Sequence, residues 1–302
     1  MVNISKIIDS HIHIFPPKRM KHAIQWVKRF IPPLPFDHTL TEDEILSHLE
    51  EAGISLFFNY VYPLSPAETR QLNRFNYAPS KKVSKAICFG SLHPGNDQKS
   101  KIIYEALFDF DLVGLKFHPF VQRFSILDRR MHEVYRVMEK LNRPIVFHTG
   151  FDHFYGAQMR PEEMEIILMR YPDLVVVIAH MFYPHIDQAF RLLKKYKNVY
   201  LDGTNIFSDY CEPLNGENIF EGSLVRKGGK RCYHIYFQHS LHDLERYSHR
   251  IMFGSDYPVA MNDPFKIYTS VRRLSISSSA KKNILEGTAR NFILRFKPDF
   301  SD

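Results

Sequence analysis

Two histidines, His11 and His13, stand one residue apart near the start of the chain, directly after an apolar run that contains Ile7 and Ile8. Along a β-strand, residues two positions apart point to the same face, so the two imidazoles can converge on one point. Two neutral imidazoles at this spacing suit a divalent transition metal. They are equally compatible with ordinary polar residues at a strand end, because so short a motif also occurs by chance.

Polar residues also end four later apolar runs. The sequence reads Gly-Leu-Lys116-Phe-His118-Pro, Ile-Val-Phe-His148-Thr-Gly, Val-Ile-Ala-His180 and Phe-Gly-Ser-Asp256-Tyr257-Pro. A single histidine at a strand end is most often part of ordinary structure. Five strand ends that all carry residue types able to bind a metal or to move a proton favour a metal site over coincidence.

The pattern of apolar residues predicts eight strands, each a short β-branched or aromatic run. They cover residues 6–9, 55–62, 83–91, 113–118, 144–148, 174–180, 199–202 and 250–255. Their mostly continuous apolar character is typical of a parallel sheet that is covered on both faces.

Helical patterns lie between these strands. Thr41 to Glu44 forms a capping box, and Ser65-Pro66 places a proline at the first helical position. Further helices are predicted over residues 20–30 and from Asp128, Pro161, His185 and Ser278. Strand followed by helix, eight times over, predicts an α/β fold of the TIM-barrel type, with a doubly wound open sheet as the alternative. In a barrel, the carboxyl ends of all strands meet at one mouth, so distant residues could reach one ion.

We expect a single domain over residues 1–302, because the sequence shows no internal repeat beyond the βα unit and no interdomain linker. Two segments, at about 15–40 and 207–249, interrupt the alternation of strands and helices. In a barrel both would lie above the same rim, where they could form a lid.

The composition is that of an ordinary globular protein, with 44% hydrophobic and 24% charged residues. The net charge of +7 is compatible with a nucleic-acid partner, but the basic residues are scattered along predicted helix faces. An anionic small-molecule substrate explains the remaining charge as well as a nucleic acid does. We therefore expect no nucleic-acid partner and leave a homo-oligomer open.

The spacing of the cysteines predicts a reducing compartment, and the short apolar runs predict a protein outside the membrane. The three cysteines are widely separated and show no CxxC spacing, which argues against a disulfide framework and a cysteine-based zinc site. The longest apolar run, Leu174 to Ala179, is far short of a membrane span, and no secretory signal precedes the first strand. We expect a cytoplasmic protein without a membrane partner.

The order of these motifs resembles the amidohydrolase superfamily, and specifically the branch that contains aminocarboxymuconate-semialdehyde decarboxylase and related metal-dependent hydrolases. The matching residues run from Ile7 to Leu294 in motif order. They are Asp9 to His13, His148, His180, Phe253 to Pro258 and a closing segment, Asn283 to Phe292. The first and last motifs are specific together, whereas a lone HxH is weak.

The resemblance implies that His11, His13 and His148 bind one divalent metal ion, which we expect to be Zn²⁺. Asp256 would be a further ligand, or a catalytic residue that handles a proton beside the metal-bound water. His180 would reach the substrate oxygen or the water. An ion with an open position lowers the pKa of bound water to about 7, which makes this combination chemically coherent.

Lys116 has two interpretations. In two-metal relatives a lysine after the fourth strand is carboxylated and bridges the ions, so a second ion is expected only if Lys116 carries this group. An uncarboxylated lysine would instead be an electrostatic partner of the substrate. His118, Arg123 and Tyr257 are predicted substrate contacts, although His118 could equally stabilise the turn before Pro119. Position alone also suggests His153, Tyr155, Asp202 and Asn205.

Four functions follow from this set of residues. The first is hydrolysis of a C–N or C–O bond in a small, anionic molecule by a metal-activated water. The second is non-oxidative decarboxylation of an aromatic or unsaturated acid at the same site. A metal-dependent deoxyribonuclease is disfavoured, because that type generally has a carboxylate where this chain has Lys116. The fourth is a barrel whose metal is only structural, or a binding protein.

Overall fold

The computed structural model describes residues 6–29, 40–83, 85–152, 154–204, 206–207, 225–227, 230–232, 240–259 and 264–300. The strands are β1 (Ile7–Ile12), β2 (Ile54–Tyr60), β3 (Ala86–Phe89), β4 (Leu115–Phe117), β5 (Ile145–His148), β6 (Phe151–Asp152), β7 (Ala157–Gln158), β8 (Val176–Ala179), β9 (Val199–Asp202), β10 (Val225–Lys227), β11 (Lys230–Cys232) and β12 (Ile251–Met252). The helices are α1 (Pro17–Val27), α2 (Glu42–Glu51), α3 (Thr69–Lys82), α4 (Lys99–Tyr104), α5 (Pro119–Gln122), α6 (His132–Lys140), α7 (Pro161–Arg170), α8 (Ile186–Lys195), α10 (Ser240–Tyr247), α11 (Pro264–Arg273), α12 (Ser278–Lys282) and α13 (Thr288–Phe296).

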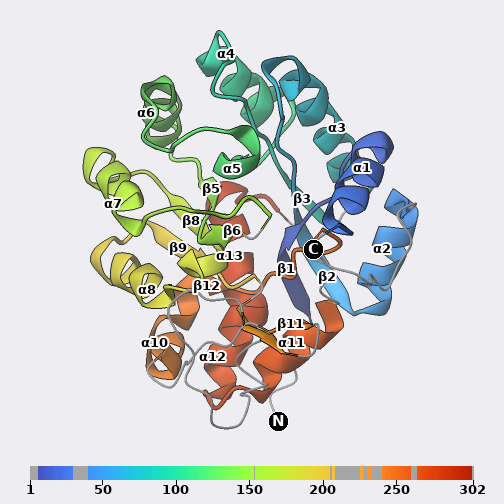
Figure 1. The fold of residues 1–302 in the computed structure, drawn as a ribbon, viewed down its shortest axis with the longest axis vertical. Coiled ribbons are helices and arrows are strands. Elements are labelled where there is room, and N and C mark those ends of the chain that lie inside the picture. Colours follow the sequence, from blue (N-terminus) through green and yellow to red (C-terminus); the bar gives the residue numbers. More distant parts are fainter. Residues whose placement is uncertain are drawn as a thin grey trace.

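Parallel strands form the centre of the molecule, and helices surround them (Figure 1). One sheet has the order β1-β2-β3, and a second has the order β12-β9-β8-β5-β4. Parallel bridges join the two sheets at both seams, Gly90 with Leu115 and Ile12 with Tyr257. The resulting strand order is that of a (β/α)8 TIM barrel, which confirms the predicted fold class.

Each of the eight predicted strand segments overlaps one of these parallel strands, although β1 extends to Ile12, three residues beyond its predicted end. The predicted capping box is present at α2, where Thr41 accepts a hydrogen bond from the Glu44 amide and the Glu44 side chain accepts one from the Thr41 amide. Two predicted helices begin with a 3-10 turn, Pro66–Glu68 before α3 and Arg129–Met131 before α6. The helix predicted over residues 20–30 is α1, which already begins at Pro17. In the two predicted insertions, residues 30–39 and most of 207–249 lie outside the described residues.

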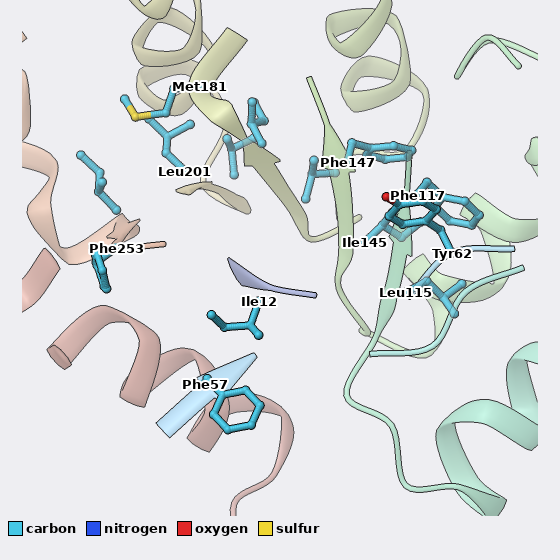
Figure 2. Close-up of a cluster of buried hydrophobic side chains, with 14 of the residues drawn as sticks. Ile12, Phe57, Tyr62, Leu115, Phe117, Ile145, Phe147, Met181, Leu201 and Phe253 are labelled. Carbon is cyan, nitrogen blue, oxygen red and sulfur yellow. The ribbon is translucent and has the colours of Figure 1, made fainter. Parts of the chain in front are cut away.

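The alternation of side chains along the strands separates two buried clusters. Leu115 and Phe117 of β4 and Ile145 and Phe147 of β5 gather on one side of these strands, where the helices pack (Figure 2). Val146 instead joins a second cluster, which fills the barrel interior together with residues of α13. Because side chains alternate along a strand, Lys116 and His148 belong to the inner face.

No helix in the described part of the chain is long and apolar enough to cross a membrane.

Candidate metal centre

The first and last strands of the barrel bring three metal-binding side chains together. His11 and His13 come from β1 and the residue after it, and Asp256 follows β12. The Nε2 atoms of the two histidines are 3.2 Å apart. Asp256 Oδ1 lies 3.2 Å from His13 Nε2 and 3.6 Å from His11 Nε2. All three residues are buried.

Hydrogen bonds at the far side of each ring fix which nitrogen faces this centre. His11 Nδ1 donates to Asp202 Oδ2 at 2.5 Å, and His13 Nδ1 donates to the carbonyl oxygen of Tyr60 at 2.9 Å. Burial also lowers the pKa of His11 well below its usual value, with the charges of Lys116 and His13 adding to the effect, so the His11 ring is neutral. With the protons on Nδ1, both Nε2 atoms present lone pairs to the centre.

The spacing of the three donor atoms fits a bound divalent ion. Tetrahedral zinc with bonds of about 2.0–2.1 Å separates its ligand atoms by about 3.3 Å, which is close to the 3.2–3.6 Å found here. Two imidazole nitrogens and a carboxylate oxygen directed at one point are a donor set that suits a divalent cation. The two imidazole planes also make an angle of 71°, so their lone pairs converge rather than run parallel.

Asp202 is held in place by its own turn. Its Oδ1 accepts hydrogen bonds from the amide and the hydroxyl of Thr204, which leaves Oδ2 for His11. Burial raises the pKa of Asp202, while the Thr204 hydrogen bond and the charge of Lys116 act in the opposite direction. A Cβ on Gly254 would lie 2.7 Å from Asp202 Oδ1 and 2.8 Å from His11 Cβ, so glycine lets these groups pack against the strand.

Two of the predicted catalytic residues have an unusual backbone. His180 has φ 64° and Asp256 has φ 62°, in the left-handed region that residues other than glycine seldom adopt. Such backbone strain clusters at functional sites. The His180 ring lies 5.1 Å from the His11 ring, and its buried Nε2 has no hydrogen-bond partner among the described residues. His180 therefore faces the centre with an unused polar atom.

Lys116 also lies against the centre. Its Nζ is 3.3 Å from His11 Nε2 and 4.8 Å from the centroid of the Tyr60 ring. Burial lowers the pKa of Lys116 to about 8, although the charges of Asp202 and Asp256 oppose this. The lysine thus places a polar group beside His11 on the inner face of the barrel, and both interpretations of its role remain predictions.

His148 belongs to a second group, beside the three converging side chains. Its Nε2 is 3.4 Å from Asp152 Oδ2, and its ring stacks on that of His118 with centroids 3.7 Å apart. Its ring centroid is 4.4 Å from that of His180, which connects this group to the centre. The structure thus brings His11, His13 and Asp256 together and places His148 next to them, with His118 and Asp152.

Aromatic rings and an arginine border the centre on the side of β1 and β2. Phe15 stacks on His13 with an interplanar angle of 5°, and Tyr62 contacts the rings of His13, Phe15 and His118. The guanidinium of Arg19 lies 5.3 Å from the Phe15 ring and 5.8 Å from the Tyr62 ring. These residues form a wall of planar apolar surface, in which Arg19 pairs with Glu68 Oε2 at 3.1 Å and donates to the carbonyl oxygen of Tyr62 at 3.1 Å.

The predicted substrate contacts lie in different environments. Arg123 is exposed at the end of α5, and the Tyr257 ring is buried against His48. Tyr155 is 41% exposed, and its ring lies 5.4 Å from that of Trp26. His153 and Asn205 lie outside the described residues.

Sequence reasoning missed three residues of this region and assigned a fourth incompletely. Tyr62, Arg19 and Asp152 carry no motif, and Asp202 appeared only as a substrate contact. The available signal was the position of Asp202 at the end of β9, since polar residues at strand ends had also identified the histidines.

Comparisons with known proteins agree with this architecture. The sequence profile of the amidohydrolase family matches residues 8–293. A search of curated proteins finds no match.

Solved structures of low sequence identity share the fold. An uncharacterized TIM-barrel protein from Bordetella bronchiseptica is 17% identical with a TM-score of 0.68, over 96% of this chain and 99% of that one. A 5-carboxyvanillate decarboxylase from Novosphingobium aromaticivorans, complexed with manganese and 4-hydroxy-3-methoxy-5-nitrobenzoic acid, is 12% identical with a TM-score of 0.66, over 95% of each chain. A 4-oxalomesaconate hydratase from Rhodopseudomonas palustris is 17% identical with a TM-score of 0.58, over 97% of each chain. Because the family profile covers nearly the whole sequence, the chain belongs to the amidohydrolase family of enzymes.

Proposed function

We propose that this protein is a metal-dependent decarboxylase that removes CO₂, without oxidation, from a planar aromatic or unsaturated carboxylic acid. The observation that carries the proposal is the convergence of His11, His13 and Asp256 beside the wall of Phe15, Tyr62 and Arg19. A planar acid can lay its ring against this wall and direct a polar group to the centre. The fold is shared with a decarboxylase complexed with manganese and a substituted benzoic acid, which supports the choice of reaction.

We assign one divalent ion to the residues of the centre. His11, His13 and Asp256 would hold it, and His148 would complete the set from β5. Nitrogen and carboxylate ligands of this kind suit zinc, which we take as the expected ion. When bound, it would supply Lewis acidity that polarises the carboxylate or a neighbouring oxygen of the substrate.

The residues of the chain would bind the acid and handle one proton. Lys116, buried beside His11, would balance the negative charge of the substrate. His180 would donate or accept a hydrogen bond at a substrate oxygen through Nε2. The C–C bond to the carboxylate breaks, CO₂ leaves, and the electron pair that remains on carbon takes up one proton, which we assign to pass through the Asp256 carboxyl group.

Hydrolysis of a C–N or C–O bond is the second candidate, because the same proximity of Asp256 to His13 and His180 also suits activation of a water. In this reaction Asp256 would accept a proton from the attacking water and return it to the leaving group. Lys116, buried beside His11, favours an anionic substrate for either reaction.

A panel of substrates separates the two reactions. The purified protein would be analysed for metal, chelated, reloaded with zinc or manganese, and incubated with aromatic and unsaturated acids and with esters, amides and lactones. We expect CO₂ release from at least one planar acid, lost on chelation, restored on metal addition and abolished in Asp256→Asn. Turnover of esters, amides or lactones without any CO₂ release would replace decarboxylation by hydrolysis. Activity that persists without metal would reject both.

A further inference from the structure

Asn59 of β2 is a buried side-chain amide that holds the chain directly after β1. The backbone pairing of β1 with β2 ends at Ile12, which lies opposite Asn59. Two residues further on, the Ile14 amide donates to Asn59 Oδ1 at 2.6 Å, and Asn59 Nδ2 donates to the Ile14 carbonyl oxygen at 3.1 Å. Two hydrogen bonds from one side chain therefore replace the backbone pairing that ends at Ile12.

A second buried asparagine, Asn76 of α3, fixes the orientation of the Asn59 amide. Asn59 Nδ2 also donates to Asn76 Oδ1 at 2.7 Å. Asn76 Nδ2 donates in turn to the carbonyl oxygens of Asn59 at 3.2 Å and Phe89 at 2.7 Å. Both amides use all their N–H groups, so neither can rotate by 180° without leaving a buried donor or acceptor unpaired.

These hydrogen bonds lie next to the metal centre on both strands. His13 immediately precedes Ile14, and Tyr60 immediately follows Asn59. The carbonyl oxygen of Tyr60 accepts a hydrogen bond from His13 Nδ1 at 2.9 Å. Because His13 and Ile14 share a peptide bond, a fixed Ile14 also fixes the backbone from which the His13 ring projects.

Stability alone is a weak explanation for two amides buried between the sheet and α3. Nearby positions are apolar, including Phe57 in β2 and Leu72 in α3. A hydrogen bond between buried neutral groups contributes little net free energy, because the same groups bind water in the unfolded chain. A fully paired buried network does specify one geometry, and here that geometry is imposed beside His13.

We propose that Asn59 is a positioning residue for His13. By holding Ile14, it sets the position and direction of the His13 ring in the metal centre, and Asn76 contributes by holding Asn59. The inference rests on the proposed function only in that an ion binds at this centre. Zinc affinity needs no turnover, so a protein that binds zinc but converts no substrate would refute the proposed function and leave this test intact.

Zinc affinity, measured by competition with a chromophoric chelator, is the first readout. We expect Asn59→Ala to weaken zinc binding about 10-fold, at the lower end of the effect of removing a partner behind a metal ligand. Asn76→Ala should weaken it less. The double variant should bind zinc as weakly as Asn59→Ala alone, because residues that act through one another do not add.

Thr288→Val is the matched control. Thr288 is also buried, and its hydroxyl donates to the carbonyl oxygen of Ser248 at 2.7 Å. This hydrogen bond lies in the turn before β12, at the opposite end of the barrel from the metal centre. We expect the zinc affinity of Thr288→Val to differ from that of the wild-type protein by no more than about threefold.

Hydrogen exchange in the metal-free protein separates positioning from a general loss of stability. The Ile14 amide is bound to Asn59, whereas the Ser10 amide, in β1, is bound to the carbonyl oxygen of Phe253 at 2.8 Å. A general loss of stability would speed the exchange of both amides equally. In Asn59→Ala we expect the exchange of Ile14 to rise about 10-fold relative to that of Ser10.

Three results would overturn the inference. The first is an equal zinc affinity of folded Asn59→Ala and the wild-type protein, and the second is an equal loss of zinc affinity in Asn59→Ala and Thr288→Val. The third is an equal acceleration of exchange at Ile14 and Ser10 in Asn59→Ala. If Asn59→Ala does not fold, Asn76→Ala decides, since unchanged zinc affinity and unchanged Ile14 exchange in that variant would also overturn the inference.

Discussion

Replacing Asp202 by asparagine tests whether the metal centre depends on the tautomer of His11. In the native chain, His11 Nδ1 donates to Asp202 Oδ2, and Thr204 holds the other oxygen. Asparagine can keep its oxygen toward Thr204, which places its NH₂ group against His11 Nδ1. Two donors cannot share this contact, so the proton of His11 is driven to Nε2 and the lone pair that faces His13 and Asp256 is lost.

The size of the effect follows from this change. Removal of a hydrogen-bond partner behind a metal-binding histidine lowers metal affinity about 10–100-fold, or about 1.4–2.7 kcal/mol. The 2.5 Å contact is short and both partners are fully buried, so we expect the upper half of this range. The loss of the carboxylate charge acts in the same direction.

Competition with a chromophoric chelator measures the zinc affinity of both proteins, and urea unfolding after metal removal measures the stability of the scaffold. Asp9→Asn is the control, because Asp9 Oδ1 accepts from the amides of His11 and Ser255, while the His11 ring is untouched. We expect the zinc affinity of Asp9→Asn to differ from that of the wild-type protein by no more than about threefold. Equal zinc affinity in folded Asp202→Asn and wild type would refute the role assigned to the His11 tautomer.

Three further substitutions test the scaffold. Gly254→Ala should lower the free energy of unfolding in urea by about 1–3 kcal/mol, because the new Cβ meets Asp202, Thr204 and His11. An unchanged urea midpoint would contradict this and show that β12 can shift to make room. Phe147→Ala should cost about 3–5 kcal/mol, with an unchanged m value, because the ring is fully buried against Phe117 and Tyr135; a loss below about 1 kcal/mol would contradict this packing. Thr41→Ala should cost about 1 kcal/mol through loss of the α2 capping box, whereas Ser47→Ala, on the exposed face of the same helix, should change the unfolding midpoint little.

Part of this protein could be predicted from local patterns. Apolar runs located all eight barrel strands, because burial on both faces of a parallel strand requires continuous apolar residues. Polar side chains at strand ends identified His11, His13 and Asp256, since the fold requires the carboxyl ends of its strands to meet. The capping box at Thr41 followed from spacing alone.

Hydrogen-bond partners could not be predicted, because they come from distant strands. Asp202 lies 191 residues from His11, and only the order β12-β9 in the sheet, with the seam to β1, brings the two together. The wall of Phe15, Tyr62 and Arg19 likewise depends on how α1 packs over β1 and β2 rather than on any motif.

The sequence by itself determined which residues face the mouth of the barrel, because side-chain alternation is a local property of a strand. Only the tertiary structure decided the orientation of those side chains. Ring orientation and proton position depend on the acceptor behind each imidazole, which is Asp202 for His11 and the Tyr60 carbonyl for His13. For His148, the nearby carboxylate is that of Asp152, in the short strand β6 that follows β5. These acceptors are placed by packing across the barrel and by turns, so residue type and spacing alone do not specify them.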